Sequence, residues 1–222
     1  MKLLISLYNL IIRFLTAFIP RKEVRKKLRQ TKLLGQVCPK NNYFYRFNNG
    51  EKSVHKIIRE GITVEIYGEN NVIEIDDSAI FHNAHLVIRG NNNLFKLGAN
   101  VTACNARFFL YGNNKSIKIG NDCMFSYGVE FWSGDGHAIF NSNETKPCNY
   151  GQDVEIGDHV WIGAHSKILK GVKIAEGCII GMQSLVTKDF LGSNSIIAGN
   201  PAKVIKKDIV WKREAPENVI EM

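Results

Sequence analysis

The sequence predicts an all-β fold, a parallel β-helix whose coils stack along one axis. Gly68, Gly90, Gly112 and Gly134 recur every 22 residues, and the phrases GENNVIEI, GNNNLFKL and GNNKSIKI begin at the first three. From residue 156 to residue 186, aliphatic residues recur every six positions. An α-helix repeats its apolar positions about every 3.6 residues and a half-buried strand every second residue, so neither accounts for these periods.

The hexad is strict in the stretch IGDHVW-IGAHSK-ILKGVK-IAEGCI-IGMQSL. Its first positions are aliphatic, namely Ile156, Ile162, Ile168, Ile174, Ile180 and then Val186. Four residues after each of the first five stands a small or β-branched residue, namely Val160, Ser166, Val172, Cys178 and Ser184. Three hexads per coil describe a triangular prism with one aliphatic side chain per face on the axis, small residues at the corners, and coils about 4.8 Å apart.

The 22-residue coils add a four-residue corner rich in Asn and Gly, which tolerate the positive φ of such corners. We expect three sets of apolar residues to keep one register from coil to coil: Ile75, Leu97 and Ile119; Phe81, Ala103 and Phe125; Val87, Phe109 and Phe131. The predicted organisation is an amphipathic basic helix over residues 1–35, a lead-in segment over 36–61, the β-helix over 62–207 and a tail over 208–222.

The charge of the chain is concentrated at its N-terminal end. The 222 residues carry a formal charge of +8, but residues 1–40 hold ten Lys or Arg and one acid, which leaves 19 basic and 20 acidic residues for the remainder. A globally basic nucleic-acid-binding domain is therefore disfavoured, and no nucleic-acid partner is expected.

The N-terminal segment has the pattern of an amphipathic helix. Its polar residues Lys2, Ser6, Asn9, Arg13 and Thr16 fall on one narrow stripe, and a basic cluster follows up to Lys32. The run is short for a transmembrane helix and contains an arginine. We expect peripheral contact through residues 1–32 with the inner face of the cytoplasmic membrane, on a cytoplasmic protein. The alternative is a helix packed on a neighbouring domain or subunit.

His137 is the first candidate for chemistry. It stands three residues after Gly134, and beyond it the next core isoleucine arrives fifteen residues late, at Ile156. This insertion predicts a protruding loop near 138–152, where an exposed imidazole can accept a proton near neutral pH. Asp135 either orients that imidazole or is a turn residue of Gly-Asp-Gly.

The stretch VEIGDHVWIGAHSKILKGVKIAEGCIIGMQSLVTKD, followed by IIAGNPAKVIKK, resembles the left-handed β-helix, hexapeptide-repeat acyltransferases. The resemblance covers residues 62–207 and is strongest with the galactoside, maltose and xenobiotic acetyltransferase branch. Within that branch, the phrase SGDGHAI resembles polysaccharide O-acetyltransferases of capsules and O-antigens. The resemblance implies a homotrimer with active sites between adjacent prisms, and acetyl-CoA as the co-substrate.

The resemblance also implies roles for single residues. His137 falls on the catalytic histidine of the family, 24 residues before Trp161. Trp161 is expected to line the acceptor or pantetheine channel with His165 beside it, although a partly buried Trp at a subunit contact is the plainer interpretation. The backbone N–H of Ala164 corresponds to the oxyanion donor. The residues expected to contact the co-substrate are Gly163, Ala164, Gly181, Met182, Thr187, Lys188, Lys203 and Lys206. Each lysine has solvation as its plainer interpretation.

The remaining reactive side chains do not predict a metal site or a covalent intermediate. Gamma-class carbonic anhydrases share this fold and bind zinc, but the spacing of His159 and His165, and of His82 and His85, does not reproduce their motif. The five cysteines are scattered and lack CxxC spacing, which favours a reducing compartment. Cys148 lies in the inserted loop, but no base-and-orienter pattern surrounds it.

The predicted function is transfer of acetyl from acetyl-CoA to a hydroxyl of a carbohydrate acceptor, a surface polysaccharide or its precursor, by direct attack with His137 as general base. Two alternatives stay open. One is N-acetylation of a nucleotide-linked amino sugar, and the other is a non-catalytic β-helix scaffold anchored at a membrane.

Overall fold

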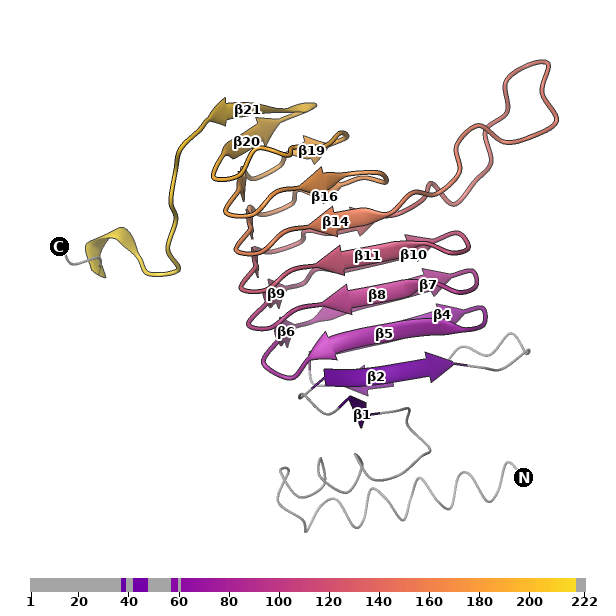
Figure 1. The fold of residues 1–222 in the computed structure, drawn as a ribbon, viewed down its shortest axis with the longest axis horizontal. Coiled ribbons are helices and arrows are strands. Elements are labelled where there is room, and N and C mark those ends of the chain that lie inside the picture. Colours follow the sequence, from indigo (N-terminus) through magenta and orange to yellow (C-terminus); the bar gives the residue numbers. More distant parts are fainter. Residues whose placement is uncertain (1–36, 39–41, 48–56, 60, 219–222) are drawn as a thin grey trace, which may run out of the picture.

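The computed structural model describes the backbone of residues 37–38, 42–47, 57–59 and 61–218, and the side chains of residues 61–218. These residues form an all-β parallel solenoid of about six turns (Figure 1), as the repeats predict. The helix expected over residues 1–35 lies outside the described residues. Within the described part, no helix is long and apolar enough to cross a bilayer.

Three sheets form the walls of the prism. Sheet A consists of β1 (Val37–Cys38), β2 (Asn42–Phe47), β5 (Asn71–Asp76), β8 (Leu94–Leu97), β11 (Ser116–Ile119), β14 (Val154–Ile156) and β17 (Lys173–Ile174). Sheet B consists of β3 (Ile57–Arg59), β4 (Ile62–Tyr67), β7 (Ala84–Arg89), β10 (Arg107–Tyr111), β13 (Glu130–Trp132), β16 (Lys167–Ile168) and β19 (Leu185–Val186). Sheet C consists of β6 (Ile80–His82), β9 (Thr102–Cys104), β12 (Met124–Phe125), β15 (Trp161–Ile162), β18 (Ile179–Ile180), β20 (Ile196–Gly199) and β21 (Ala202–Lys206).

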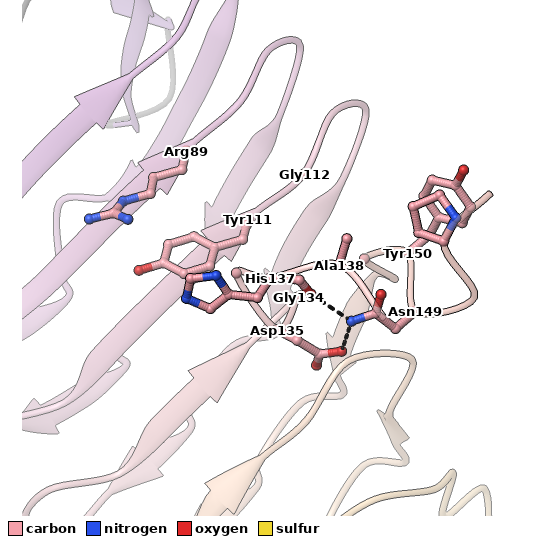
Figure 2. Close-up of a pocket in the computed structure, with 12 residues that line it drawn as sticks. Arg89, Tyr111, Gly112, Gly134, Asp135, His137, Ala138, Asn149 and Tyr150 are labelled. Carbon is pink, nitrogen blue, oxygen red and sulfur yellow. Dashed lines mark hydrogen bonds between the residues drawn. The ribbon is translucent and has the colours of Figure 1, made fainter. Parts of the chain in front are cut away.

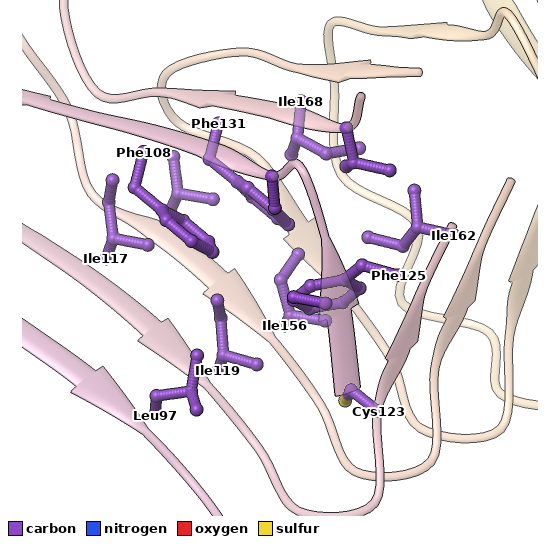
Figure 3. Packing of buried hydrophobic residues seen from close by; sticks show 14 of the residues in the cluster. Leu97, Phe108, Ile117, Ile119, Cys123, Phe125, Phe131, Ile156, Ile162 and Ile168 are labelled. Atoms are coloured by element: carbon purple, nitrogen blue, oxygen red, sulfur yellow. The ribbon is translucent and has the colours of Figure 1, made fainter. Parts of the chain in front are cut away.

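The chain visits sheets A, C and B in turn, and from β7 to β20 each strand pairs in parallel with the preceding strand of its sheet. The side chain that begins each hexad points to the axis, and these six residues are buried, as predicted. The five corner residues that follow them are buried as well. Figure 3 shows how isoleucines and phenylalanines from successive coils fill the interior.

One of the three predicted register sets is wrong. The axis positions of sheet B are Leu86, Phe108 and Phe131, which pair in register and are fully buried. Val87 and Phe109 each follow one of these axis residues in the chain. Phe109 pairs with Trp132 on the outer face of the sheet. Side chains alternate between the faces of a strand, so this shift by one residue reverses which of them enter the core.

The shift arises at a corner. Four residues separate Ala103 from Phe108 in one coil, and five separate Phe125 from Phe131 in the next. Gly128, in the longer corner, has φ +71°. From here on, sheet B is displaced by one residue relative to the 22-residue repeat.

Asparagines stabilise the corners in two ways. Several adopt positive φ, among them Asn70, Asn92 and Asn114. Others form a buried ladder, in which the side-chain oxygen of Asn71 accepts the backbone N–H of Asn93 at 3.0 Å. The buried peptide groups at these turns thereby find hydrogen-bond partners.

Antiparallel strands cover both open ends of the solenoid. At the start, β2 pairs antiparallel with β5 and β3 with β4, so the described part of the lead-in segment closes the first coil. At the other end, β21 folds back on β20. These strands cover the edges of β4, β5 and β20, which would otherwise be free to pair with other chains.

The C-terminal tail runs back along the corner between sheets A and C. Trp211 is buried, its ring stacks on His159 with 4.0 Å between centroids, and its Nε1 donates to the carbonyl of His159. Arg213 donates to Asp122, which also contacts Nδ1 of His159 at 2.7 Å. Burial alone would raise the pKa of Asp122, but hydrogen bonds from His159 and Arg213 hold it below its ordinary value. The tail is therefore part of the folded body.

The register can be tested with two neighbouring phenylalanines of β10. Phe108→Ala should lower the free energy of unfolding by about 3–5 kcal/mol, because it opens a cavity between the rings of Phe95 and Phe131. Phe109→Ala is the matched control and should cost clearly less, because Phe109 lies on the outer face. Urea denaturation followed by circular dichroism measures both. A larger loss for Phe109→Ala would contradict the register.

Candidate functional site

A pocket of about 290 Å³ lies at the corner where sheet B passes to sheet A, beside the inserted loop. Arg89, Tyr111, His137, Asn149 and Tyr150 contribute its larger side chains (Figure 2). His137 is exposed, as its place in an insertion predicts. The loop between β13 and β14 projects from the prism (Figure 1).

The loop leaves and re-enters the prism at one narrow point. The N–H of Gln152 donates to the carbonyl of Ser133 at 2.8 Å, which joins the two ends. A Cβ on Gly151 would lie 2.8 Å from the carbonyl oxygen of Tyr111, and one on Gly134 3.1 Å from the same oxygen. Both glycines are therefore needed for this close approach. Gly134 stacks on Tyr111, although the 22-residue repeat aligns it with Gly112, because of the displacement of sheet B.

Asn149 fixes the backbone around His137. Its Nδ2 donates to the carbonyl of His137 at 2.8 Å and to Asp135 at 2.7 Å (Figure 2). Its Oδ1 accepts the N–H of Ile139 at 2.8 Å. One side chain from the returning arm thus holds three points on the outgoing arm, and the position of the imidazole depends on it.

Asp135 is engaged with Lys170 as well as Asn149. The Lys170 ammonium forms an ion pair with Oδ2 of Asp135 and also donates to the carbonyl of Asn149. The hydrogen bond from Lys170 holds the pKa of Asp135 below its ordinary value, against the opposing effect of burial. Among the described residues, no hydrogen bond joins Asp135 to the ring of His137.

A second group of candidates lies on sheet C. Trp161 begins β15, is half-buried, and its Nε1 lies 3.4 Å from Oγ of Ser126. Gly163 directly follows the last residue of β15, and from this position small residues stack from coil to coil. A Cβ on Gly163 would lie 2.5 Å from the backbone N of Met182, and one on Gly181 would lie 2.8 Å from Cβ of Ala198. This column of small residues ends at Lys203, which pairs with Ala198, while Lys206 pairs with Ile196 on the neighbouring column.

Ala164 and His165 form the corner that follows β15. The N–H groups of Gly163 and His165 donate to Ile180 and Tyr127 of neighbouring coils. The N–H of Ala164 has no acceptor among the described residues. His165 adopts φ +58° and its ring packs edge-on against Tyr127. His159 occupies the equivalent corner position one face earlier, with φ +53°.

One prism does not bring all the predicted site residues together. His137 and Asp135 lie between β13 of sheet B and β14 of sheet A, and Thr187 and Lys188 follow β19 at the same corner. Trp161, Gly163, Gly181 and the lysines of β21 belong to sheet C, the wall opposite that corner. Met182 is exposed on the corner after Gly181. The two groups face away from each other within one chain.

Four residues of the site were missed by the sequence analysis. Asn149 lies in the inserted loop and Lys170 is a polar position of the hexad ILKGVK, and only folding brings them to Asp135. Arg89 and Tyr111 did carry a signal, because Tyr67, Arg89 and Tyr111 precede the repeat glycines and are themselves 22 residues apart. Because this position changes from aromatic to cationic to aromatic between coils, its residue type is not dictated by the packing of the corner.

The described thiols differ sharply in environment. Burial raises the pKa of Cys123 to about 12, and burial also raises the pKa of Cys178. Cys148 is exposed on the loop, where its Sγ contacts the carbonyl of Ile139 at 3.3 Å. Among residues 61–218, no three His, Cys, Asp or Glu side chains converge as a metal site would need.

Comparison with known proteins identifies the relatives of this chain. Residues 153–188 match the family model for bacterial transferase hexapeptide (six repeats). A polysialic acid O-acetyltransferase of Escherichia coli O1:K1 / APEC is 38% identical over 93 residues, which is 42% of this chain and 30% of that protein. A polysialic acid O-acetyltransferase of Neisseria meningitidis is 32% identical over 93 residues, 42% of this chain and 43% of the relative. The matches thus span less than half of each curated relative.

A solved structure extends the similarity. The crystal structure of the polysialic-acid-specific acetyltransferase NeuO superimposes with a TM-score of 0.66 and 32% sequence identity, and the alignment covers 72% of both chains.

The loop anchor yields a prediction. Asp135→Asn and Lys170→Met should each speed hydrogen exchange of the amides of 139–148 by about two- to fivefold, because a partly exposed ion pair contributes about 1 kcal/mol or less. Lys173→Met, which removes the exposed pair with Glu155, is the control and should leave the loop unchanged. Since the pKa of Asp135 is lowered, the wild-type anchor should persist at neutral pH and be lost only as the pH falls through that lowered pKa. Equal exchange in all variants would contradict the anchor.

Proposed function

The chain belongs to the hexapeptide-repeat acetyltransferases, and from this membership we propose that it transfers acetyl from acetyl-CoA to a hydroxyl of a surface polysaccharide or its precursor. The polysaccharide is of the bacterial capsule or O-antigen type. The observation that carries the proposal is the exposed imidazole of His137, which lines a pocket large enough for a sugar ring and whose backbone carbonyl is held by Asn149. The polysialic acid O-acetyltransferases among the relatives support a polysaccharide acceptor.

In the proposed reaction, His137 accepts the proton of the acceptor hydroxyl as its oxygen attacks the thioester carbonyl. The tetrahedral intermediate places negative charge on the carbonyl oxygen, for which the N–H of Ala164 is the proposed donor. Collapse breaks the carbon–sulfur bond, and the imidazolium returns its proton to the departing thiolate. Asp135 acts on His137 through Asn149, which contacts both residues. No thiol of the chain is acetylated in this scheme.

The co-substrate is proposed to lie along sheet C. We place its extended pantetheine arm along the column of small residues from Gly163 through Gly181, with the exposed Met182 at its side and Trp161 and His165 flanking the channel. Lys203 stands at the end of this column and Lys206 at the end of the neighbouring one, where their charges suit the phosphates of CoA. Thr187 and Lys188 are proposed to contact the same molecule from a neighbouring prism.

The proposal therefore includes a homotrimer of left-handed prisms. His137 and sheet C lie on opposite sides of one prism, so a complete site requires the corner of one chain to face sheet C of the next. A closed threefold ring of identical contacts satisfies this requirement. Residues 62–207 form the catalytic domain in this scheme.

Residues 1–32, which lie outside the described part, are proposed to hold the enzyme on the cytoplasmic face of the membrane by their amphipathic pattern and basic charge. Membrane attachment fits a lipid-linked glycan better than a soluble nucleotide sugar.

Acceptor screening separates the main proposal from its two alternatives, N-acetylation of a nucleotide-linked amino sugar and a non-catalytic scaffold. Purified protein is incubated with radiolabelled acetyl-CoA and either oligosialic acid, a neutral glycan or a nucleotide amino sugar. Transfer only to the last, or to none, would reject the proposal.

The general base gives a direct prediction. His137→Ala should lower kcat by about 10²- to 10⁴-fold while the protein stays folded, because hydroxyl attack loses its proton acceptor. His82→Ala, an exposed histidine on β6, is the matched control and should retain wild-type activity. Steady-state release of CoA thiol measures both. A His137→Ala enzyme with near-normal kcat would exclude the role.

The phosphate end of the co-substrate gives another. Lys206→Ala should raise the KM for acetyl-CoA by about three- to tenfold and leave the KM for acetyl-dephospho-CoA unchanged, because the lost partner is the 3′-phosphate. Lys118→Ala removes an exposed lysine of sheet A and should change neither value. If Lys206→Ala raised the KM for acetyl-CoA and for acetyl-dephospho-CoA equally, Lys206 would not bind the 3′-phosphate.

A further inference from the structure

Arg89 has an unusual position in the His137 pocket. It ends β7 in register with Tyr67 of β4 and Tyr111 of β10, so the three side chains form a ladder on the outside of the corner. Its Cζ lies 5.3 Å from the ring centroid of Tyr67 and 5.3 Å from that of Tyr111. Two aromatic contacts on neighbouring strands restrict the rotation of the guanidinium and hold it at the edge of the pocket.

The charge of Arg89 is not neutralised by the described residues, because its guanidinium forms neither a hydrogen bond nor an ion pair with any of them and contacts only the two tyrosine rings. Glu65, two residues before Tyr67 on β4, contacts the hydroxyl of Tyr67 and Nε2 of His85 instead. Asp135, the acid that lines the pocket, is already paired with Lys170 and Asn149. By contrast, Arg213 makes hydrogen bonds to Asp122, Thr102 and two backbone carbonyls. The pocket thus keeps one free, preoriented cation.

Tyr111 connects this cation with His137. A Cβ on Gly136 would lie 3.6 Å from Cε2 of Tyr111, so the backbone next to His137 passes close to the tyrosine ring. Figure 2 shows Arg89, Tyr111 and His137 lining the same side of the pocket. A sugar bound with a hydroxyl at His137 would therefore have an aromatic surface and a guanidinium beside it.

We propose that Arg89 binds a carboxylate of the acceptor, so that the enzyme acts on an acidic glycan whose sugars carry carboxyl groups. A guanidinium matches a planar carboxylate through two parallel N–H···O bonds, and its stacking on Tyr67 and Tyr111 lowers the entropic cost of forming them. The inference rests on the proposed function and specifies its acceptor class. The phosphates of CoA are the other anion that Arg89 could bind, but in the proposed function they bind the lysines of β21.

The test uses oligosialic acid and the same oligosaccharide with its carboxyl groups converted to amides. For the wild-type full chain, the acidic form should have the lower KM by about ten- to a hundredfold, as expected for charged hydrogen bonds. Arg89→Gln should raise the KM for the acidic form by a similar factor. Its KM for the amidated form and its kcat should both stay within about twofold of the wild-type values. Arg89→Lys should restore only part of the affinity, because it keeps the charge and loses the bidentate geometry. Arg107→Gln, an exposed arginine at the other end of β10, is the matched control.

Three results would overturn the proposal. They are equal use of the acidic and amidated forms by the wild type, equal losses on both forms in Arg89→Gln, and a rise in the KM for acetyl-CoA in that variant. Calorimetric titration of each oligosaccharide into the protein separates this proposal from the catalytic one. Binding of the acidic form that depends on Arg89, without transfer, would reject the acetyltransferase function and keep the anion site. Transfer to a neutral glycan alone would keep the acetyltransferase function and reject the anion site.

Discussion

The structure depends on the hydrogen-bonded stacking of each coil on the one before it. The parallel ladders of the three sheets align residues about one coil apart, so one side chain per face meets its counterpart along the axis. Because every coil is satisfied only by its neighbours, a change of one residue at a corner is carried into all the strands of that sheet that follow. The corner at Gly128 is such a change, and it places Phe131, not Glu130, in register with Phe108 on the axis.

The same displacement shapes the candidate site. It places Gly134 on Tyr111, and the chain leaves the prism over that tyrosine. The inserted loop then returns to Gly151, and Asn149 joins its two arms. A rigid stack of strands thus supports an exposed loop at one defined point. This arrangement positions the imidazole of His137 without burying it.

Electrostatics at the corner follow from which charges are already paired. Lys170 neutralises Asp135 and holds the loop, while Arg89 is stacked on two tyrosines and keeps its donors available. On the opposite wall, the lysines of β21 lie beyond a column of small residues. The near neutrality of residues 41–222 therefore conceals two local groups of cationic side chains, in addition to the basic charge of residues 1–40.

The sequence by itself determined the solenoid, its axis residues from Ile156 onward, the insertion after His137 and the small corner residues. Each of these follows from a period that only stacked coils satisfy, and the period is visible without coordinates. It did not determine the register of sheet B, because one extra corner residue leaves the apolar pattern nearly unchanged. Only the tertiary structure decided that Asp135 meets Lys170 and Asn149, that Arg89 stands beside His137, and that His137 faces away from Trp161. These relations join residues from different coils and faces, and their distances depend on the path of the loop and the closure of the prism.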